Sequence, residues 1–352
     1  MTQFEHPVPA PSLSQSERDN AVRYRPGHAE GHVESHFLKA NSPDGERALW
    51  LKHTLRVPAA RPSEAVAEVW AVAFAERGRR KVARKRSFPL AQAHLSDAPF
   101  GIVTPCAALS QGRAHGTLGH GSATVSWDLR YACPETSFRP YPLARMYTGG
   151  FPRSKSVTPV PDTRMEGSFE VFGERWEIDG WRGAQGHNWG RSHAHAYAWV
   201  HANSWELDHG SEPLAGVWLE ALSGKVRMGP SRLSVTSPFL SVAAVAIDGE
   251  LVRFDGPRAL ASRRVRMDTR SYAFTLTHGD ARLEAEFRAG SEQLAGLRYD
   301  DPDGSTLACL NSKLARGRMV LSYGGRTVRL RTKQAALELG TREPGHGIEL
   351  LA

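Results

Sequence analysis

The sequence has few cysteines and no long apolar run. Its 352 residues include three cysteines, which are far apart and form no C-x-x-C pair: Cys106, Cys133 and Cys309. Such spacing argues against a disulfide framework and against a zinc site built on thiolates. The longest apolar run, at residues 239–247, is far shorter than the roughly 18–20 residues that a transmembrane helix needs. The N-terminus also lacks a signal-peptide pattern, so we expect a cytoplasmic protein.

Basic residues outnumber acidic ones, but they are spread along the chain. The formal net charge is +8 and the pI is about 9.6. The one dense cluster, RGRRKVARKR at residues 77–86, lies between two strand-like runs, where a solvated hairpin turn explains it better than a nucleic-acid surface. We therefore expect no nucleic-acid partner. Peripheral contact with a membrane and the oligomeric state are left open.

Period-two alternation recurs along most of the chain, and long amphipathic helical patterns are nearly absent. Hairpins are expected at residues 168–181, 214–229, 242–254 and 272–287. In the third of them, Asp248 and Gly249 favour a type I′ turn because both residues accept a positive φ. Short strands separated by turn residues predict an all-β protein of sandwich or barrel type rather than β-α-β units.

Residues 138–164 are the segment that most strongly indicates a boundary between two domains. They contain five prolines and two adjacent glycines, which helices and central strands do not tolerate. Such a stretch is either a linker between two β domains or a long loop over the mouth of one barrel. We favour the linker. The expected division is a disordered tail at residues 1–25, a first β domain at 26–160 and a second at 161–352.

The strip from His193 to Asn203 alternates large polar or aromatic residues with small ones. In an extended chain the odd-numbered residues share one face, about 6.5–7 Å apart, and the opposite face is nearly all alanine. This pattern predicts a strand that lines a ligand cavity, with its alanine face close to another layer. The predicted ligand contacts on this strand are His193, His195, Tyr197, Trp199, His201 and Asn203.

Two other interpretations of the segment from His193 to Asn203 stay open. His193 and His195 could present two imidazoles to one metal ion, with His187 or His201 as a third ligand. Against this, no carboxylate partner is identifiable, and His-x-His pairs arise freely in a chain with 15 histidines. The side chains could also form a polar core or a wet surface. We favour the cavity and predict neither a metal nor an organic cofactor.

The preceding residues, 180–191, place four glycines around a polar and aromatic group. Such glycine density indicates tight turns or the close approach of another segment. In one interpretation, His187 and Asn188 form an acid–base pair at the mouth of a cavity. In the other, a bulged loop uses Trp189 to close the end of a barrel.

The block GHNWGR (residues 186–191), followed by the run YAWVHAN, resembles the lipocalin-like superfamily that contains carotenoid 1,2-hydratase (hydroxyneurosporene synthase), with tocopherol cyclase as a remoter relative. Earlier segments, ESHFLKAN and EVWAVAF, look similar too, so the resemblance spans residues 34–218. It implies two lipocalin-like β-barrel or sandwich halves enclosing an apolar cavity. It also implies cofactor-free hydration, cyclisation or isomerisation of isoprenoid, carotenoid-like or polyketide chains.

Such a reaction delivers a proton to an alkene carbon in a dry cavity, where aromatic faces stabilise the carbocation. His187 is the first candidate for the donor, with Asn188 orienting water or substrate. Asp179 and Glu220 are further candidates, because each lies on a strand expected to be half-buried, where desolvation favours the protonated acid. The remaining predicted substrate contacts are Trp189, Arg191 and Trp218.

Two alternative functions follow from the same residues. The first is a protein that binds a lipid or pigment without catalysis, and the second is a metalloenzyme that uses the histidines of the strip. In the favoured interpretation the partner is a hydrophobic small molecule.

Overall fold

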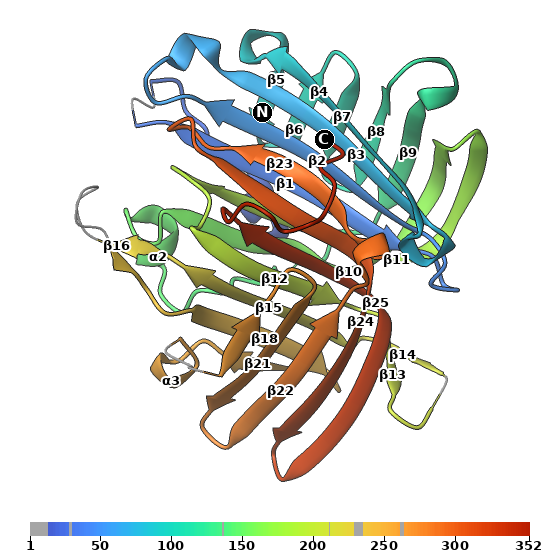
Figure 1. Cartoon of the computed structure of the whole chain (residues 1–352), viewed down its shortest axis with the longest axis vertical. Coiled ribbons are helices and arrows are strands. Elements are labelled where there is room, and N and C mark those ends of the chain that lie inside the picture. Colours follow the sequence, from blue (N-terminus) through green and yellow to red (C-terminus); the bar gives the residue numbers. More distant parts are fainter. Residues whose placement is uncertain (1–12, 28–29, 136, 211, 229–234, 261–263) are drawn as a thin grey trace, which may run out of the picture.

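The computed structural model describes residues 13–27, 30–135, 137–210, 212–228, 235–260 and 264–352. Its regular structure is almost entirely β, in two large antiparallel sheets that curl and pack on one another (Figure 1). The prediction of an all-β fold with two curled halves is confirmed. No helix in the described part of the chain is long and apolar enough to cross a membrane.

The first sheet is a meander whose first strand also pairs with its last long strand. Its order is β4-β3-β2-β1-β11-β10-β9-β8-β7-β6-β5. The strands are β1 (His32–Asn41), β2 (Ala48–Val57), β3 (Val66–Ala75), β4 (Arg80–Pro89), β5 (His94–Asp97), β6 (Phe100–Thr104), β7 (Ala107–Ser110), β8 (Arg113–Leu118), β9 (Val125–Tyr131), β10 (Ser154–Val171) and β11 (Glu174–Gly190).

The second sheet follows the order β19-β18-β15-β12-β25-β24-β22-β21-β20, with β23 paired to β24 and β13 to β25. Its strands are β12 (Ala196–Ala202), β13 (Trp205–Leu207), β14 (Pro213–Leu214), β15 (Trp218–Lys225), β18 (Leu240–Ile247), β19 (Glu250–Phe254), β20 (Val265–Met267), β21 (Ser271–His278), β22 (Ala281–Arg288), β23 (Ala295–Asp300), β24 (Thr306–Tyr323) and β25 (Arg326–Thr341). A separate pair joins β16 (Arg227–Met228) to β17 (Val235–Thr236).

Helices are few and short. They are α1 (Gln15–Asn20), α2 (Arg145–Thr148) and α3 (Pro257–Leu260), with the 3-10 turns η1 (Pro62–Glu64), η2 (Glu76–Gly78), η3 (Leu90–Gln92), η4 (Gly121–Ala123) and η5 (Ser291–Gln293). A capping box at Ser14 and Glu17 begins α1, because each side chain bonds the backbone N–H of the other residue.

Buried side chains form three layers: the interior of each curled half and the layer between the two sheets. Because residues alternate across a strand, Leu38 of β1 enters the first interior, whereas its neighbour Phe37 packs in the layer between the sheets. On β12, Ala198 and Val200 fill the second interior, while Trp199 contacts Phe37 across the sheets. The aromatic face of β12 therefore meets the first sheet rather than a barrel interior, contrary to the expected arrangement.

Two glycines make room for aromatic rings in the layer between the sheets. Phe37 lies over its cross-strand neighbour Gly186, and Tyr197 lies over Gly340. A Cβ atom added at Gly186 would lie 2.2 Å from Phe37 Cζ, and one at Gly340 would lie 2.1 Å from Tyr197 Cε1. Glycine at these positions thus lets the rings lie flat against a neighbouring strand.

Replacing Gly186 with alanine is expected to lower the free energy of unfolding by about 1–3 kcal/mol, because the added methyl group forces Phe37 out of its place. The urea midpoint of the purified variant measures this loss. The control is Gly150→Ala, where nothing lies within 4 Å of the new Cβ and the expected change is within about 0.5 kcal/mol. Equal midpoints for the two variants would contradict the packing argument.

The predicted turns and boundaries hold in part. The Asp248-Gly249 turn is confirmed, with φ of 53° and 77° joining β18 to β19. The hairpin expected at 214–229 is wrong, because β15 continues to Lys225 and pairs with β12 and β18 instead. In the basic cluster, η2 forms the turn, and the residues from Arg80 onward belong to the edge strand β4.

The prediction of a disordered tail at residues 1–25 is wrong for residues 13–25, which the structure describes. Residues 1–12 lie outside the described residues, but α1 follows, with Asp19 and Asn20 buried against the first sheet. Residue 160, the predicted domain boundary, falls inside β10, and the chain passes from the first sheet to the second at residues 191–195. A division into two domains stays a prediction.

Candidate functional site

The predicted site residues lie in two separate places. His187 is on β11 and faces the interior of the first half, where it stacks on His36. Trp199 and Glu220 lie in the layer between the sheets. Asn188, next to His187 on the same strand, directs its side chain to the opposite face. The expected pairing of His187 with Asn188 as one acid–base unit therefore does not occur.

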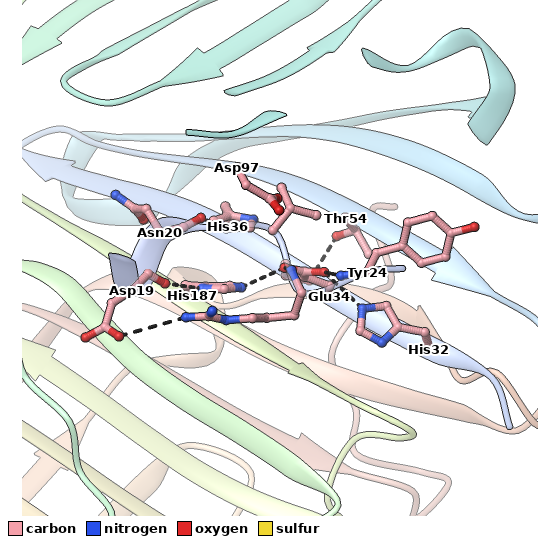
Figure 2. A network of polar contacts seen from close by, with 12 residues as sticks. Asp19, Asn20, Tyr24, His32, Glu34, His36, Thr54, Asp97 and His187 are labelled. Carbon is pink, nitrogen blue, oxygen red and sulfur yellow. Dashed lines mark hydrogen bonds and ion pairs between the residues drawn. The ribbon is translucent and has the colours of Figure 1, made fainter. Parts of the chain in front are cut away.

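His187 belongs to a buried network, the N-terminal clasp, made of Asp19, Asn20, Glu34, His36 and His187 (Figure 2). The Nδ1 atom of His187 lies 2.6 Å from the backbone oxygen of Asp19, and its Nε2 atom lies 2.9 Å from Oε1 of Glu34. Both partner atoms are oxygens that accept hydrogen bonds, so both ring nitrogens of His187 are engaged within the clasp. His187 thus has no nitrogen left for a substrate.

Glu34 is the centre of the clasp. Its carboxylate accepts hydrogen bonds from the backbone N–H groups of Arg23 (2.7 Å) and Tyr24 (2.8 Å), and from Nε2 of His32 (2.9 Å) as well as from His187. Burial alone would raise the pKa of Glu34, but the bonds from His187 and His32 outweigh it and hold the pKa well below its usual value. The clasp ties residues 19–25 to β1 and β11.

The clasp also contains the one group of described residues whose ligand atoms could surround a metal ion. The ligand atoms of Glu34, His36 and His187 lie within 4.8 Å of one another. However, the two imidazole rings stack with centroids 3.8 Å apart and an angle of 15° between their planes. Nitrogen lone pairs lie in the ring plane, so stacked rings direct them side by side rather than toward one ion. This arrangement does not fit a metal centre.

A second buried group, the inter-sheet site, lies where β10 crosses β12 and β15. We define it as Thr158, Trp199, His201, Trp218 and Glu220. The Thr158 hydroxyl lies 2.8 and 2.7 Å from the two carboxyl oxygens of Glu220, and Trp199 Nε1 donates to Oε1 at 3.3 Å. Irregular register on both sides of Val160 gives β10 the bulges that direct Thr158 toward the second sheet.

Glu220 has the properties of an acid that is protonated near neutral pH. Its side chain is buried and has no cationic partner within ion-pair distance among the described residues. Burial raises the pKa of Glu220 to about 7, although hydrogen bonds from Thr158 and Trp199 oppose this shift. The carboxyl group can therefore both give and take a proton near neutral pH.

Aromatic rings and a neutral histidine surround this acid. His201 is the cross-strand neighbour of Glu220, and burial together with the charge of Lys39 lowers the pKa of His201 well below its usual value. Trp218 precedes Glu220 by two residues on the same face of β15 and packs on Phe138 at 5.3 Å between ring centroids. The site thus combines a proton donor with flat apolar faces.

The other predicted contacts are more scattered. His193 and His195 precede β12, which begins at Ala196, so they do not extend its aromatic face. Nδ1 of His193 bonds Asp301 at 2.8 Å. The two histidines therefore do not present the pair of imidazoles that a metal site on one strand requires.

Four further residues lie outside the inter-sheet site. Asp179 is exposed, so the expected half-buried strand position is wrong for it. Arg191 forms an exposed ion pair with Glu30. Trp189 packs against His187 at the clasp. Tyr197 is in the inter-sheet layer, over Gly340.

Sequence reasoning missed three buried lysines in the layer between the sheets: Lys39, Lys52 and Lys313. Lys52 Nζ lies 3.7 Å from the ring centroid of Tyr299, and Lys313 bonds Glu338 at 2.8 Å. The sequence did contain a signal for one of them, because Lys39 lies two residues after Phe37 on β1 and therefore on the same face of the strand. A charged residue on the same strand face as a buried aromatic one indicates a buried polar network.

Two hollows of the surface lie elsewhere. One, of about 580 Å³, borders Arg266, Glu284 and Arg318, and another, of about 400 Å³, borders Cys106 and His115. Neither includes Glu220 or its neighbours. The residues of the inter-sheet site are themselves buried.

Comparison with known proteins supports the fold. No family model matches the chain. Two uncharacterized proteins of Mycobacterium tuberculosis, from strains CDC 1551 and H37Rv, are each 26% identical over 206 residues, which is 58% of this chain. The match covers 57% of the length of these curated relatives.

Solved structures align over almost the whole chain at low identity. A Nitrosomonas europaea protein provisionally assigned as AttH has a TM-score of 0.53 at 14% identity, covering 94% of this chain and 97% of its own. The structure of CghA with Sch210972 has a TM-score of 0.56 at 10% identity, and the alignment covers 95% of this chain and 97% of CghA. Kievitone hydratase from Nectria haematococca has a TM-score of 0.51 at 10% identity, and the alignment covers 94% of this chain and 96% of the hydratase. The chain therefore shares the fold of these three structures.

Proposed function

We propose that this chain is a cofactor-independent enzyme that hydrates, cyclises or isomerises an apolar unsaturated substrate, with Glu220 as the proton donor. The observation that supports this most is a carboxyl group with a pKa raised to about 7, buried beside Trp199 and near Trp218. A general acid is most effective when its pKa lies near the working pH.

The reaction begins with protonation of the alkene. The alkene electron pair takes the proton of Glu220, so a C–H bond forms, the O–H bond breaks and a carbocation develops on the neighbouring carbon. The faces of Trp199 and Trp218 stabilise that cation, and exclusion of water prevents its early capture. Addition of water, attack by a second alkene or loss of a neighbouring proton then gives hydration, cyclisation or isomerisation. In each case a proton returns to the Glu220 carboxylate.

The substrate class rests on two kinds of support. The block GHNWGR and the aromatic run after it resemble isoprenoid-converting hydratases, which favours isoprenoid, carotenoid-like or polyketide chains. A structural neighbour with the same fold is itself named a hydratase. GHNWGR contributes His187 to the clasp rather than a proton donor, so we assign that role to Glu220.

Substrate reaches Glu220 in this proposal by displacing residues 137–153. Phe138 of this segment covers Trp218 and pairs with Thr158 through two backbone hydrogen bonds, of 2.9 and 2.8 Å. The same segment exposes Leu143 and Phe151, which are apolar side chains at the surface. An apolar entry lined by such residues suits a hydrophobic chain.

The test is incorporation of deuterium from deuterium oxide into polyprenyl alcohols and acyclic carotenoids, followed by mass spectrometry. Glu220→Gln is expected to lower turnover by about 10²–10⁴-fold, because the amide cannot deliver a proton. In the native chain, turnover is expected to fall as pH rises through about 7, because only the protonated acid reacts. The control is Glu286→Gln, an exposed carboxylate on the second sheet, which should leave turnover unchanged.

Two outcomes would count against the proposal. Unchanged turnover in Glu220→Gln would remove Glu220 as the donor. Retention of a hydrophobic ligand by the native chain, with no deuterium incorporation from any substrate, would favour a protein that binds a lipid or pigment without converting it.

A further inference from the structure

Lys39 is a buried amine whose hydrogen-bond partners are two neutral amide groups. Its Nζ atom donates to Oδ1 of Asn41 at 3.2 Å and to Oδ1 of Asn203. Within the described part of the chain, no carboxylate oxygen lies within 4.0 Å of this atom. An ammonium carries three N–H donors, so the two amide partners leave one donor unused and the charge unpaired.

The contrast with Lys313 shows what Lys39 lacks. Lys313 is equally buried in the same layer, but its Nζ atom bonds Oε1 of Glu338 at 2.8 Å and Oδ1 of Asn311 at 2.7 Å. Buried cations in proteins are usually paired in this way, because an isolated charge away from water is costly.

Asp162, the carboxylate whose charge acts on Lys39, is hydrogen-bonded to other groups. One oxygen of Asp162 accepts from Arg182 Nη1 at 2.7 Å, and the other accepts from the Asn203 amide at 2.9 Å. Asp162 therefore faces two cations, Arg182 and Lys39, with one negative charge. This corner of the layer has an excess of positive charge that a bound anion would balance.

Strand β12 connects this corner to the inter-sheet site. His201 is the cross-strand neighbour of Glu220, and Asn203, which holds Lys39, follows two residues later. A step of two residues along an extended chain spans about 6.5–7 Å. An anion held by Lys39 would thus lie roughly one such step along β12 from the acid.

We infer that Lys39 binds the carboxylate of the substrate, so that the substrate is an unsaturated apolar acid rather than a neutral hydrocarbon. This inference rests on the proposed function, because the same bound molecule extends from Lys39 to Glu220. The carboxylate would take the unused N–H donor and supply the missing negative charge. Strong charge-assisted bonding of this kind also fixes which carbon of the chain faces Glu220.

The test compares two probes with the same chain, oleate and oleyl alcohol, by quenching of tryptophan fluorescence at neutral pH. The native chain is expected to bind oleate at least about tenfold more tightly than the alcohol. Lys39→Met should remove this preference by weakening oleate alone. Lys85→Met, at a partly exposed lysine paired with Glu68, is the matched control and should keep it.

The preference for oleate should also fall as pH rises above about 7, because burial lowers the pKa of Lys39 to about 7 and the amine then loses its proton. Equal binding of the two probes by the native chain would overturn the inference, as would equal weakening of both in Lys39→Met. Glu220→Gln, which keeps Lys39, is expected to keep the preference for oleate over the alcohol. Loss of turnover in that variant tests the proposed function separately, so either idea can fail while the other stands.

Discussion

Replacing Glu34 with glutamine is expected to lower the free energy of unfolding by about 3–5 kcal/mol, since it leaves several buried donors without the carboxylate oxygens that accept from them. Glu34 accepts four hydrogen bonds, two on each oxygen. Glutamine keeps one acceptor oxygen and directs an amide N–H₂ at two of the former donors. His187 then loses the carboxylate that holds its Nε2 atom.

The urea midpoint measures the global loss, and limited proteolysis within residues 13–25 shows whether the clasp opens first. The matched control is Glu64→Gln, which breaks an exposed ion pair with Arg61 and should cost at most about 1 kcal/mol. A loss in Glu34→Gln no greater than that in Glu64→Gln would show that the clasp does not stabilise the fold.

The pH dependence of the clasp has a definite sign. The pKa of Glu34 is depressed in the folded chain, so its stabilising effect is present above the ordinary carboxyl pKa and is lost as pH falls through the folded value. Acid should therefore weaken the native chain more than Glu34→Gln, which has already lost this contribution.

The strands could be predicted from the sequence because side-chain alternation and turn residues are local properties. The hairpin expected at residues 272–287 is formed by β21 and β22, and Asp248 with Gly249 forms the turn between β18 and β19. Which face of a strand meets which layer is not local. The alternation at residues 197–201 separates two faces correctly, yet only the packing of two sheets decides that the alanine face fills an interior.

The site was harder to predict, for the same reason. GHNWGR directs attention to His187, but the partners that occupy both its nitrogens come from residues 19 and 34, far away in the chain. Glu220 was a candidate because it lies on an apolar strand, and burial does raise its pKa. Lys39 was missed because its unusual property is that no carboxylate of the described residues forms an ion pair with it, which depends on how Asp162 is oriented in the fold.

Replacing Lys39 with methionine is expected to stabilise the chain at neutral pH. Burial lowers the pKa of Lys39 from 10.5 to about 7, with the charges of Lys313 and Arg182 contributing in the same direction and that of Asp162 opposing them. Between these two values the unfolded chain binds more protons than the folded one, so stability rises with pH by up to about 1.4 kcal/mol per unit. The ammonium therefore costs up to about 5 kcal/mol at low pH.

Methionine removes that cost but leaves the Asn203 oxygen without its donor, at about 1–3 kcal/mol. The expected net gain is about 2–4 kcal/mol near pH 7 and below, and it should disappear as pH approaches about 10. Urea unfolding at several pH values measures both the gain in the free energy of unfolding and the loss of its dependence on pH. Lys85→Met, whose lysine is paired and partly exposed, should show neither.

If Lys39→Met were less stable than the native chain and kept the native dependence of stability on pH, the interactions of the buried amine in the fold would offset the cost of burying it. The expected result points the other way. A side chain that lowers stability, at a position where an apolar residue of similar length fits, is characteristic of a binding site rather than of packing. A bound carboxylate would pair the ammonium and offset its cost. Oleate should therefore raise the urea midpoint of the native chain more than that of Lys39→Met.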